Sequence, residues 1–173
     1  MGDFWVFGYG SLMWNPGFAT LRRERATMYG VHRALCVHSW VHRGTRDKPG
    51  LVLGLDRGGS CQGIALQAPA EAREEIIAYL RERELVTRVY LERWRRARLE
   101  GGQAVLALTY LVDPAHEQYA GRLPDEDVCR IVRHGIGKSG ANIDYLRNTI
   151  RHLREMAVHD PHLEAIERRL QAG

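Results

Sequence analysis

Strand-like and helix-like segments are sorted along this sequence, and that order restricts the fold classes open to it. Patterns typical of strands, either wholly apolar or alternating, occupy most of the first two thirds of the chain. Their ranges are 4–8, 28–40, 51–55, 61–67, 86–94 and 103–112. Helical spacing dominates after residue 123, and one further helix is expected over 68–84, with Pro69 in its first turn. Strands followed mainly by helices are typical of α+β folds, so we expect a largely antiparallel sheet or barrel.

Turn and capping residues mark where these segments end. Residues 56–60 read Asp-Arg-Gly-Gly-Ser, which predicts a hairpin between the strands on either side. In the helical third, Asn142 is expected to cap one helix, and Asp160 followed by proline is expected to begin the last one.

The length of 173 residues fits one domain, which we expect to span residues 1–173. No apolar run approaches the roughly 18 residues of a membrane-spanning helix, and no signal-peptide pattern is visible at the N-terminus. Cys36, Cys61 and Cys129 are odd in number, widely spaced and in no metal-like pattern. We therefore expect a cytoplasmic protein without a membrane partner, and the oligomeric state stays open.

A formal net charge of +4 and a pI near 9.2 raise the question of a nucleic-acid partner. The arginines are densest around Trp94, at positions 93, 95, 96 and 98. Glutamates at positions 82, 84, 92 and 100 surround this cluster, so it is not a stripe of one sign. A solvated, arginine-rich surface is favoured over nucleic-acid binding. An anionic small-molecule substrate explains the mild positive bias equally well.

Two glycine-containing motifs match nucleotide-binding loops only in part. The sequence Gly8-Tyr9-Gly10 lacks the third glycine of the dinucleotide fingerprint, because that position is Met13. Residues 137–139, Gly-Lys-Ser, lack the first glycine of a P-loop, because that position is Val132. Gly8 and Gly10 therefore predict either an ordinary tight turn or a loop whose backbone amides hold a ligand.

Histidine pairs also occur at positions 38 and 42 and at positions 159 and 162. Neither pair has a nearby cysteine or a convincing third carboxylate, so we expect no metal site. Spacing alone leaves a Ser11-His-Asp triad open, although Ser11 lies outside the G-x-S-x-G context of such serines.

One carboxylate stands out in the helix expected over 68–84. Ile77, Leu80 and Glu84 fall on one stripe, which aims Glu84 toward the side where the helix buries its apolar residues. Partial burial and the helix C-terminus both raise a carboxyl pKa, which suits a general base near neutral pH. The alternative is an ion pair at the helix end, with Arg83, Arg88 or Arg43 as partner.

Several motifs in the same order resemble the ChaC-type γ-glutamylcyclotransferases, and they are spread over nearly the whole chain. The matching residues are 6–14 (V-F-G-Y-G-S-L-M-W), 42–45 (H-R-G-T), 48–50 (K-P-G), Tyr79-Leu80, Arg83-Glu84, Ser139-Gly140, Asn142 and Tyr145-Leu146. Eukaryotic members follow the Arg-Glu pair with Gly-Gly-Tyr. This chain has Leu-Val-Thr at 85–87, which is closer to the bacterial members.

The resemblance implies a small, mostly antiparallel β-barrel flanked by helices. It also implies an enzyme that cleaves glutathione into 5-oxoproline and cysteinylglycine without a cofactor. It implies that Glu84 is the catalytic glutamate. The substrate-binding loop that it implies consists of Val6, Phe7, Gly8, Tyr9, Gly10, Ser11 and Leu12.

The implied reaction explains why such residues are needed. The α-amine of the substrate attacks its own γ-amide carbonyl, so a base must take a proton from the amine, and backbone amides can hold the α-carboxylate or the carbonyl oxygen. Arg43 is a candidate partner for the glycine carboxylate, or a surface arginine of a turn. Tyr145 is a candidate hydrogen-bond donor to substrate, or a core residue. Two alternatives are a cyclotransferase acting on other γ-glutamyl amino acids or γ-glutamylamines, and a non-catalytic basic module that binds RNA.

Overall fold

The structure, a computed structural model, describes residues 2–173 and divides the chain into two compact units. The first unit comprises Met1–Arg33 and Leu55–Asp113, and the second comprises Ala34–Gly54 and Pro114–Gly173. A single domain over the whole chain stays a prediction. Within the residues that the structure describes, no helix is long and apolar enough to cross a membrane.

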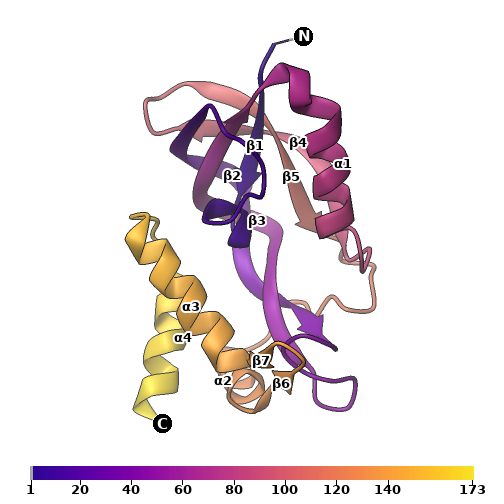
Figure 1. Cartoon of the computed structure of the whole chain (residues 1–173). Helices are drawn as coiled ribbons and strands as arrows, with labels where there is room; N and C mark the ends of the chain where they lie inside the picture. The colour runs from indigo at the N-terminus through magenta and orange to yellow at the C-terminus, as the bar shows by residue number, and fades with distance from the viewer. Residues whose placement is uncertain (1) are drawn as a thin grey trace. The chain divides into compact units, whose positions relative to one another are not determined.

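Five strands within residues 2–173 close into a barrel, in the order β1-β3-β2-β4-β5. They are β1 (Phe4–Gly8), β2 (Arg22–Ser39), β3 (Gly50–Ala68), β4 (Tyr90–Leu99) and β5 (Ala104–Val112). Strand β1 is antiparallel to β3 and parallel to β5, and β4 is antiparallel to both β2 and β5 (Figure 1). The predicted α+β fold with a mostly antiparallel barrel is thus confirmed.

Strand β1 is the most buried strand of the barrel. All five of its residues are buried, which explains why its sequence shows no polar alternation. Val6 pairs with Leu66 on β3 and with Leu108 on β5, and none of these three side chains is exposed. The residues that directly follow β1 therefore start from a rigid position.

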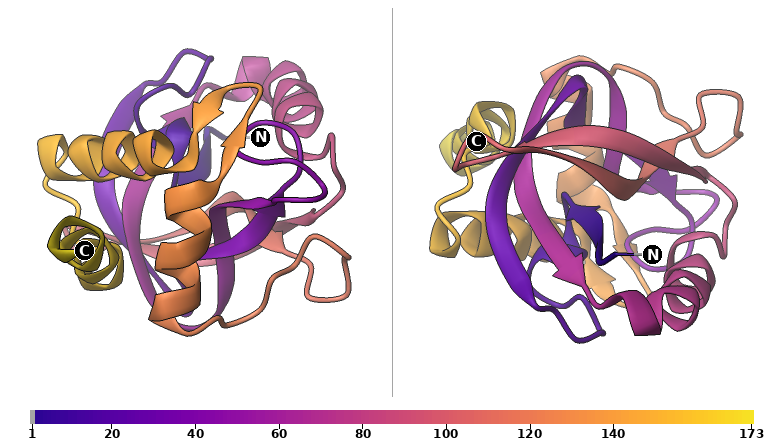
Figure 2. Two further views of the ribbon diagram at one scale, coloured as in Figure 1. Left: turned by 90° about the horizontal axis from the view of Figure 1, so that it is seen from below. Right: turned by 90° about the horizontal axis from the view of Figure 1, so that it is seen from above.

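One helix flanks the barrel within the first unit. Helix α1 (Arg73–Glu84) follows the short 3-10 helix η2 (Ala70–Ala72) and buries Ile76 and Leu80. The Arg73 guanidinium lies over the rings of Phe4 and Trp94, at 5.1 and 4.9 Å from their centroids. Helix α1 lies outside the strands of the barrel (Figure 1 and Figure 2).

The second unit holds three helices and a small two-stranded sheet. The helices are α2 (Asp125–His134), α3 (Asn142–Glu155) and α4 (Pro161–Ala172), and the strands are β6 (Ile136–Gly137) and β7 (Gly140–Ala141). The helices pack on one another in different directions (Figure 2). As predicted, Asp160 caps the last helix, because its carboxylate accepts a 3.0 Å hydrogen bond from the Leu163 amide. The Arg154–Glu167 ion pair, at 2.6 Å, joins α3 to α4.

The hairpin predicted at residues 56–60 is wrong. Strand β3 continues without interruption from Gly50 to Ala68, and its neighbour β2 runs beside it. Gly58 and Gly59 have φ angles of 95° and 69°, so the chain bends there without reversing. The Gly58 carbonyl lies 2.9 Å from Nδ1 of His32 on β2, which links the two strands at the bend. Two adjacent glycines are compatible with a local distortion inside a strand as well as with a hairpin turn, so the pattern fits both structures.

The predicted cap at Asn142 is also wrong. Ala141 occupies the N-cap position of α3 and makes no side-chain capping bond. Asn142 is fully buried, and its amide accepts from the Leu51 N–H at 2.7 Å and donates to the Leu51 carbonyl at 2.8 Å. The side chain therefore satisfies two backbone groups of β3 rather than the start of its own helix.

Candidate active site

The turn after β1 is tight, and it leaves little space for a side chain at Gly8. Residues Ser11–Met13 form a 3-10 helix, η1, and the Met13 amide donates to the Gly10 carbonyl at 2.9 Å. A Cβ atom added to Gly8 would lie 3.1 Å from the Met13 nitrogen and 3.2 Å from Leu12 Cβ. The amides of Gly10 and Ser11 come before or at the first residue of η1, so neither has a partner within this helix.

A buried arginine determines how the turn is oriented. Arg33 on β2 is only 3% exposed, and its Nε donates to the Tyr9 carbonyl at 2.6 Å. One terminal nitrogen of the same guanidinium donates to the Gln62 carbonyl on β3, also at 2.6 Å. In a trans peptide the C=O and the following N–H point in opposite directions. Because the Tyr9 carbonyl faces Arg33, the Gly10 N–H points away from it.

Arg33 was not among the residues selected from the sequence, although its position in β2 carries a signal. Val31, Arg33 and Leu35 alternate along β2, and all three are buried. A charged residue in the inward register of a strand indicates a buried polar contact, because an unpaired buried charge is costly.

Glu84 is the last residue of α1, and its side chain is 18% exposed. The buried residues before it are Ile76 and Leu80, four residues apart, while the predicted Ile77 is half-buried. Burial raises the pKa of the Glu84 carboxyl, and the positive charge of Arg83 opposes this rise without cancelling it. Arg83 Nε lies 3.4 Å from Glu84 Oε1, so the ion pair that the sequence left open is present.

The Arg83 guanidinium also reaches the segment that follows the glycine turn. One terminal nitrogen donates to Ser11 Oγ at 2.8 Å. The other donates to the Asn15 carbonyl at 2.6 Å and to the Tyr79 hydroxyl at 3.0 Å. One side chain thus connects the end of α1 to residues 11–16.

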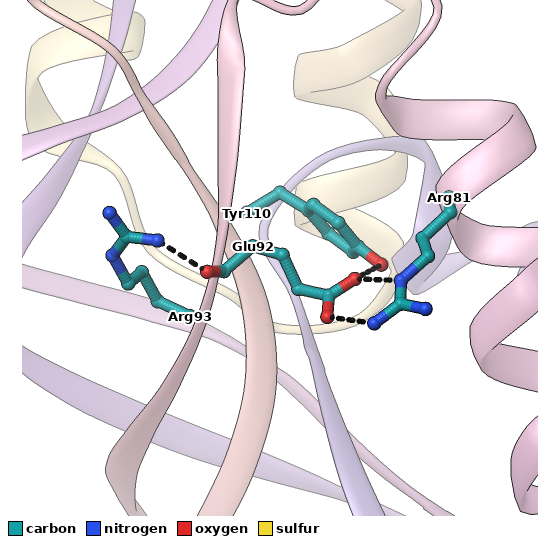
Figure 3. Close-up of polar contacts among 4 residues, drawn as sticks. All are labelled: Arg81, Glu92, Arg93 and Tyr110. Carbon is teal, nitrogen blue, oxygen red and sulfur yellow. Dashed lines mark hydrogen bonds and ion pairs between the residues drawn. The ribbon is translucent and has the colours of Figure 1, made fainter.

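A second arginine anchors the end of α1 to the barrel. Arg81 makes two charge-assisted hydrogen bonds to the Glu92 carboxylate on β4, at 2.8 and 2.9 Å (Figure 3). These bonds lower the pKa of the Glu92 carboxyl. The Tyr110 hydroxyl on β5 donates to the same carboxylate at 3.3 Å. Arg93, also drawn in Figure 3, reaches only the backbone carbonyl of Glu92.

Tyr110 is buried, and its pKa is strongly raised. The main cause is burial, followed by the negative charges of Glu92 and Glu84. Tyr110 therefore stays protonated at neutral pH, and its surroundings include the Glu84 carboxylate.

Arg43 and Tyr145 come together in the second unit. The Arg43 guanidinium lies 5.5 Å from the centroid of the Tyr145 ring and donates to the carbonyls of Ser139 and Ala141, at 2.8 and 3.2 Å. The Tyr145 hydroxyl accepts from the Leu53 amide at 3.0 Å. Both side chains thus have structural partners, and their roles in substrate binding stay predictions.

Comparison with known proteins decides the family. The model of the family described as "ChaC-like protein" matches residues 4–172. The chain belongs to this ChaC-like family.

Curated relatives of this ChaC-like chain carry specific names. It is 34% identical to the glutathione-specific γ-glutamylcyclotransferase of Escherichia coli, over 92% of this chain and 69% of the relative. It is also 34% identical to glutathione-specific γ-glutamylcyclotransferase 1 of Danio rerio, over 98% of this chain and 90% of the relative. The crystal structure of a yeast γ-glutamylcyclotransferase specific to glutathione has the same fold, with a TM-score of 0.87 and 21% identity over 99% of this chain and 97% of that one.

The residues predicted from the sequence fall into three groups in the ChaC-like structure. Gly8, Tyr9, Gly10, Ser11 and Glu84 all lie in the first unit, where Arg83 joins Ser11 to Glu84. The side chains of Val6, Phe7 and Leu12 are buried in its core, so only their backbone is available to a ligand. Arg43 and Tyr145 belong to the second unit. No three His, Cys, Asp or Glu side chains within residues 2–173 are grouped so as to hold a metal ion.

Proposed function

We propose that this chain is a glutathione-specific γ-glutamylcyclotransferase that cleaves glutathione into 5-oxoproline and cysteinylglycine without a cofactor. The observation that carries the proposal is the 34% identity to the E. coli enzyme of that name, over 92% of this chain. The geometry of the first unit supports it, because a largely buried carboxylate is tied through Arg83 to the turn at Gly8–Ser11. The reaction requires a base and a set of fixed hydrogen-bond donors of this kind.

The chemistry begins with the α-ammonium group of the γ-glutamyl residue. Glu84 takes a proton from it, and the free amine attacks the γ-carbonyl carbon to close a five-membered ring. The C–N bond to cysteine then breaks as the leaving amine takes that proton from Glu84, and the carboxylate next carries the second proton of the attacking nitrogen to the same amine, so that a lactam N–H and the ammonium group of cysteinylglycine result. A raised carboxyl pKa suits both transfers, because the same group is first a base and then an acid.

The turn at residues 8–11 supplies orientation. Gly10 N–H points away from Arg33, so it can donate to the substrate's α-carboxylate or to the oxygen of the γ-carbonyl as negative charge develops there. Holding the γ-glutamyl chain folded contributes much of the acceleration, because well-oriented intramolecular reactions reach effective molarities of about 10⁵–10⁸ M.

The test is the production of 5-oxoproline by the purified chain from glutathione, beside γ-glutamylalanine as the competing substrate class. Wild type should convert glutathione, and Glu84→Gln should lose about 10²–10⁴-fold in kcat. Glu82→Gln is the matched control, because Glu82 is an exposed glutamate two residues earlier on the same helix. Absence of product from glutathione would contradict the proposal, and product from γ-glutamylalanine alone would change the substrate class.

We also propose a cytoplasmic location, where glutathione is abundant and reduced. None of the three cysteines forms a disulfide within the described residues 2–173, in keeping with a reducing compartment. Fractionation of the producing cells, with the chain detected by antibody, tests this location.

A further inference from the structure

We propose that Arg83 is a positioning residue for the reaction: one guanidinium holds the carboxylate of Glu84 and the 11–16 segment in a fixed mutual arrangement. The inference rests on the proposed function, since it assigns a role beside the base of that reaction. It also assigns a role to the ion pair between Arg83 and Glu84 at the end of α1. Glu84 can pair with an arginine and still act as the base.

The contacts of Arg83 use all three of its nitrogens. Nε faces Glu84 Oε1 at 3.4 Å, and one terminal nitrogen donates to Ser11 Oγ at 2.8 Å. The remaining nitrogen reaches the Asn15 and Pro16 carbonyls, at 2.6 and 3.3 Å. Because a guanidinium is planar and rigid, its three nitrogens fix the relative positions of the groups they contact. A lysine ammonium, which is a single point charge, cannot reproduce this arrangement.

The distances divide the roles of these contacts. Bonds of 2.6 and 2.8 Å to Asn15 and Ser11 are short hydrogen bonds that hold the segment firmly. The 3.4 Å separation from Glu84 is longer than a normal hydrogen bond, so Arg83 orients the carboxylate electrostatically. The lone pairs of Glu84 therefore remain available to accept a proton from a substrate amine.

A purely structural role, fastening the end of α1, is already filled by Arg81. Its bidentate ion pair with Glu92 ties the last turn of the helix to β4. Arg83 instead contacts the 11–16 segment and the carboxylate of Glu84, besides the Tyr79 hydroxyl one turn earlier on its own helix. The two arginines therefore form a natural pair of test sites, two residues apart on one helix.

The charges around Glu84 determine the direction of the expected effect. Arg83 is the cation beside Glu84, and Tyr110 on β5 is protonated at neutral pH. The negative charge of Glu92 is balanced by its ion pair with Arg81. Burial raises the pKa of Glu84, and Arg83 opposes this rise. Removing the Arg83 charge should therefore move the acidic limb of the pH–rate profile to higher pH.

The experiment compares Arg83→Gln, Arg83→Lys and, as the matched control, the double variant Arg81→Gln/Glu92→Gln by the pH dependence of kcat/KM in the 5-oxoproline assay. We expect Arg83→Gln to lower kcat/KM by about 10–100-fold and to move the acidic limb upward by about one pH unit. Arg83→Lys should restore the position of the limb, since it restores the charge, but not the full rate. The double variant should leave the limb where it is in wild type, because it removes the Arg81–Glu92 ion pair without leaving an unpaired charge near Glu84.

A second readout separates failure of this inference from failure of the proposed function. A ¹³C NMR titration of the Glu84 carboxyl carbon, assigned by its loss in Glu84→Gln, measures the pKa without any substrate. The Glu84 pKa should rise in Arg83→Gln and not in the double variant Arg81→Gln/Glu92→Gln. Equal limbs in wild type and Arg83→Gln, or equal pKa shifts in Arg83→Gln and the double variant, overturn the inference. Absence of 5-oxoproline from wild type overturns the proposed function, and the titration still tests the coupling of Arg83 to Glu84.

Discussion

Nε of the buried Arg33 donates a 2.6 Å hydrogen bond to the carbonyl of Tyr9, from inside the barrel to the turn that follows β1. The bond turns the following amide away from the barrel interior, so a core residue determines which backbone donors the turn presents. A buried charge can hold a loop in this way only if its own hydrogen-bonding groups are satisfied. Arg33 meets this condition, because it also donates to the Gln62 carbonyl.

Arg33→Met should therefore impair both stability and turnover. Hydrogen bonds to charged groups contribute about 1.5–3 kcal/mol each, so we expect a loss of about that size or more in the free energy of unfolding. Turnover should fall further than the unfolded fraction explains, because the turn loses its fixed orientation. Urea unfolding and the 5-oxoproline assay measure the two effects, and Arg57→Met, at an exposed arginine of β3, is the control.

Gly8→Ala should displace the turn. The new methyl group would lie 3.1–3.2 Å from Met13 N and Leu12 Cβ, and overpacking of this kind costs about 1–3 kcal/mol. The melting temperature should fall, and kcat/KM should fall with it. Gly2→Ala is the matched control, since nothing lies within 4 Å of its added methyl group. Equal melting temperatures for the two variants would show that the turn yields freely.

Glu84→Gln should stabilise the protein at neutral pH while it lowers turnover by about 10²–10⁴-fold. The folded-state pKa of Glu84 is raised above its ordinary value of 4.5, so ionisation favours the unfolded chain. The protonated carboxyl therefore stabilises the fold in full below the unfolded-state pKa, and this stabilisation is lost as pH rises through the folded-state pKa. Urea unfolding at several pH values should show Glu84→Gln above wild type at pH 7.5, with the gap closing near pH 4. Glu82→Gln should show no comparable gap.

His38 should make stability fall in mild acid. Its Nδ1 is buried and has no hydrogen-bond partner within residues 2–173, and burial lowers its pKa below the ordinary 6.5. The unfolded chain therefore binds a proton that the folded chain refuses, and stability decreases as pH falls below 6.5 toward the folded pKa. His38→Leu should remove this part of the pH dependence of the urea midpoint between pH 7.5 and 5. His162→Leu, at an exposed histidine, should leave it intact.

Local pattern was sufficient for much of the fold. The apolar run of β1, the helix that ends at Glu84 and the start of the last helix at Asp160 all follow from neighbouring residues. The limits of two strands were predicted wrongly. The structure begins β2 at Arg22 and extends β4 to Leu99, where exposed arginines alternate with buried Ala97 and Leu99. When the outer face is charged and the apolar face is short, the sequence pattern does not indicate a strand.

Glu84 could be selected as a candidate base from the sequence because helix periodicity relates it to Leu80, four residues away. Its partners could not be selected in this way. Arg33 meets Tyr9 across 24 positions, and Arg83 meets Ser11 across 72, because closure of the barrel and docking of α1 bring these segments together. The errors at residues 56–60 and at Asn142 have the same origin, since β2 beside β3, and Leu51 beside Asn142, settle those conformations. Contacts between residues that are close in sequence can be predicted from the sequence, whereas contacts between distant segments depend on how the whole barrel closes.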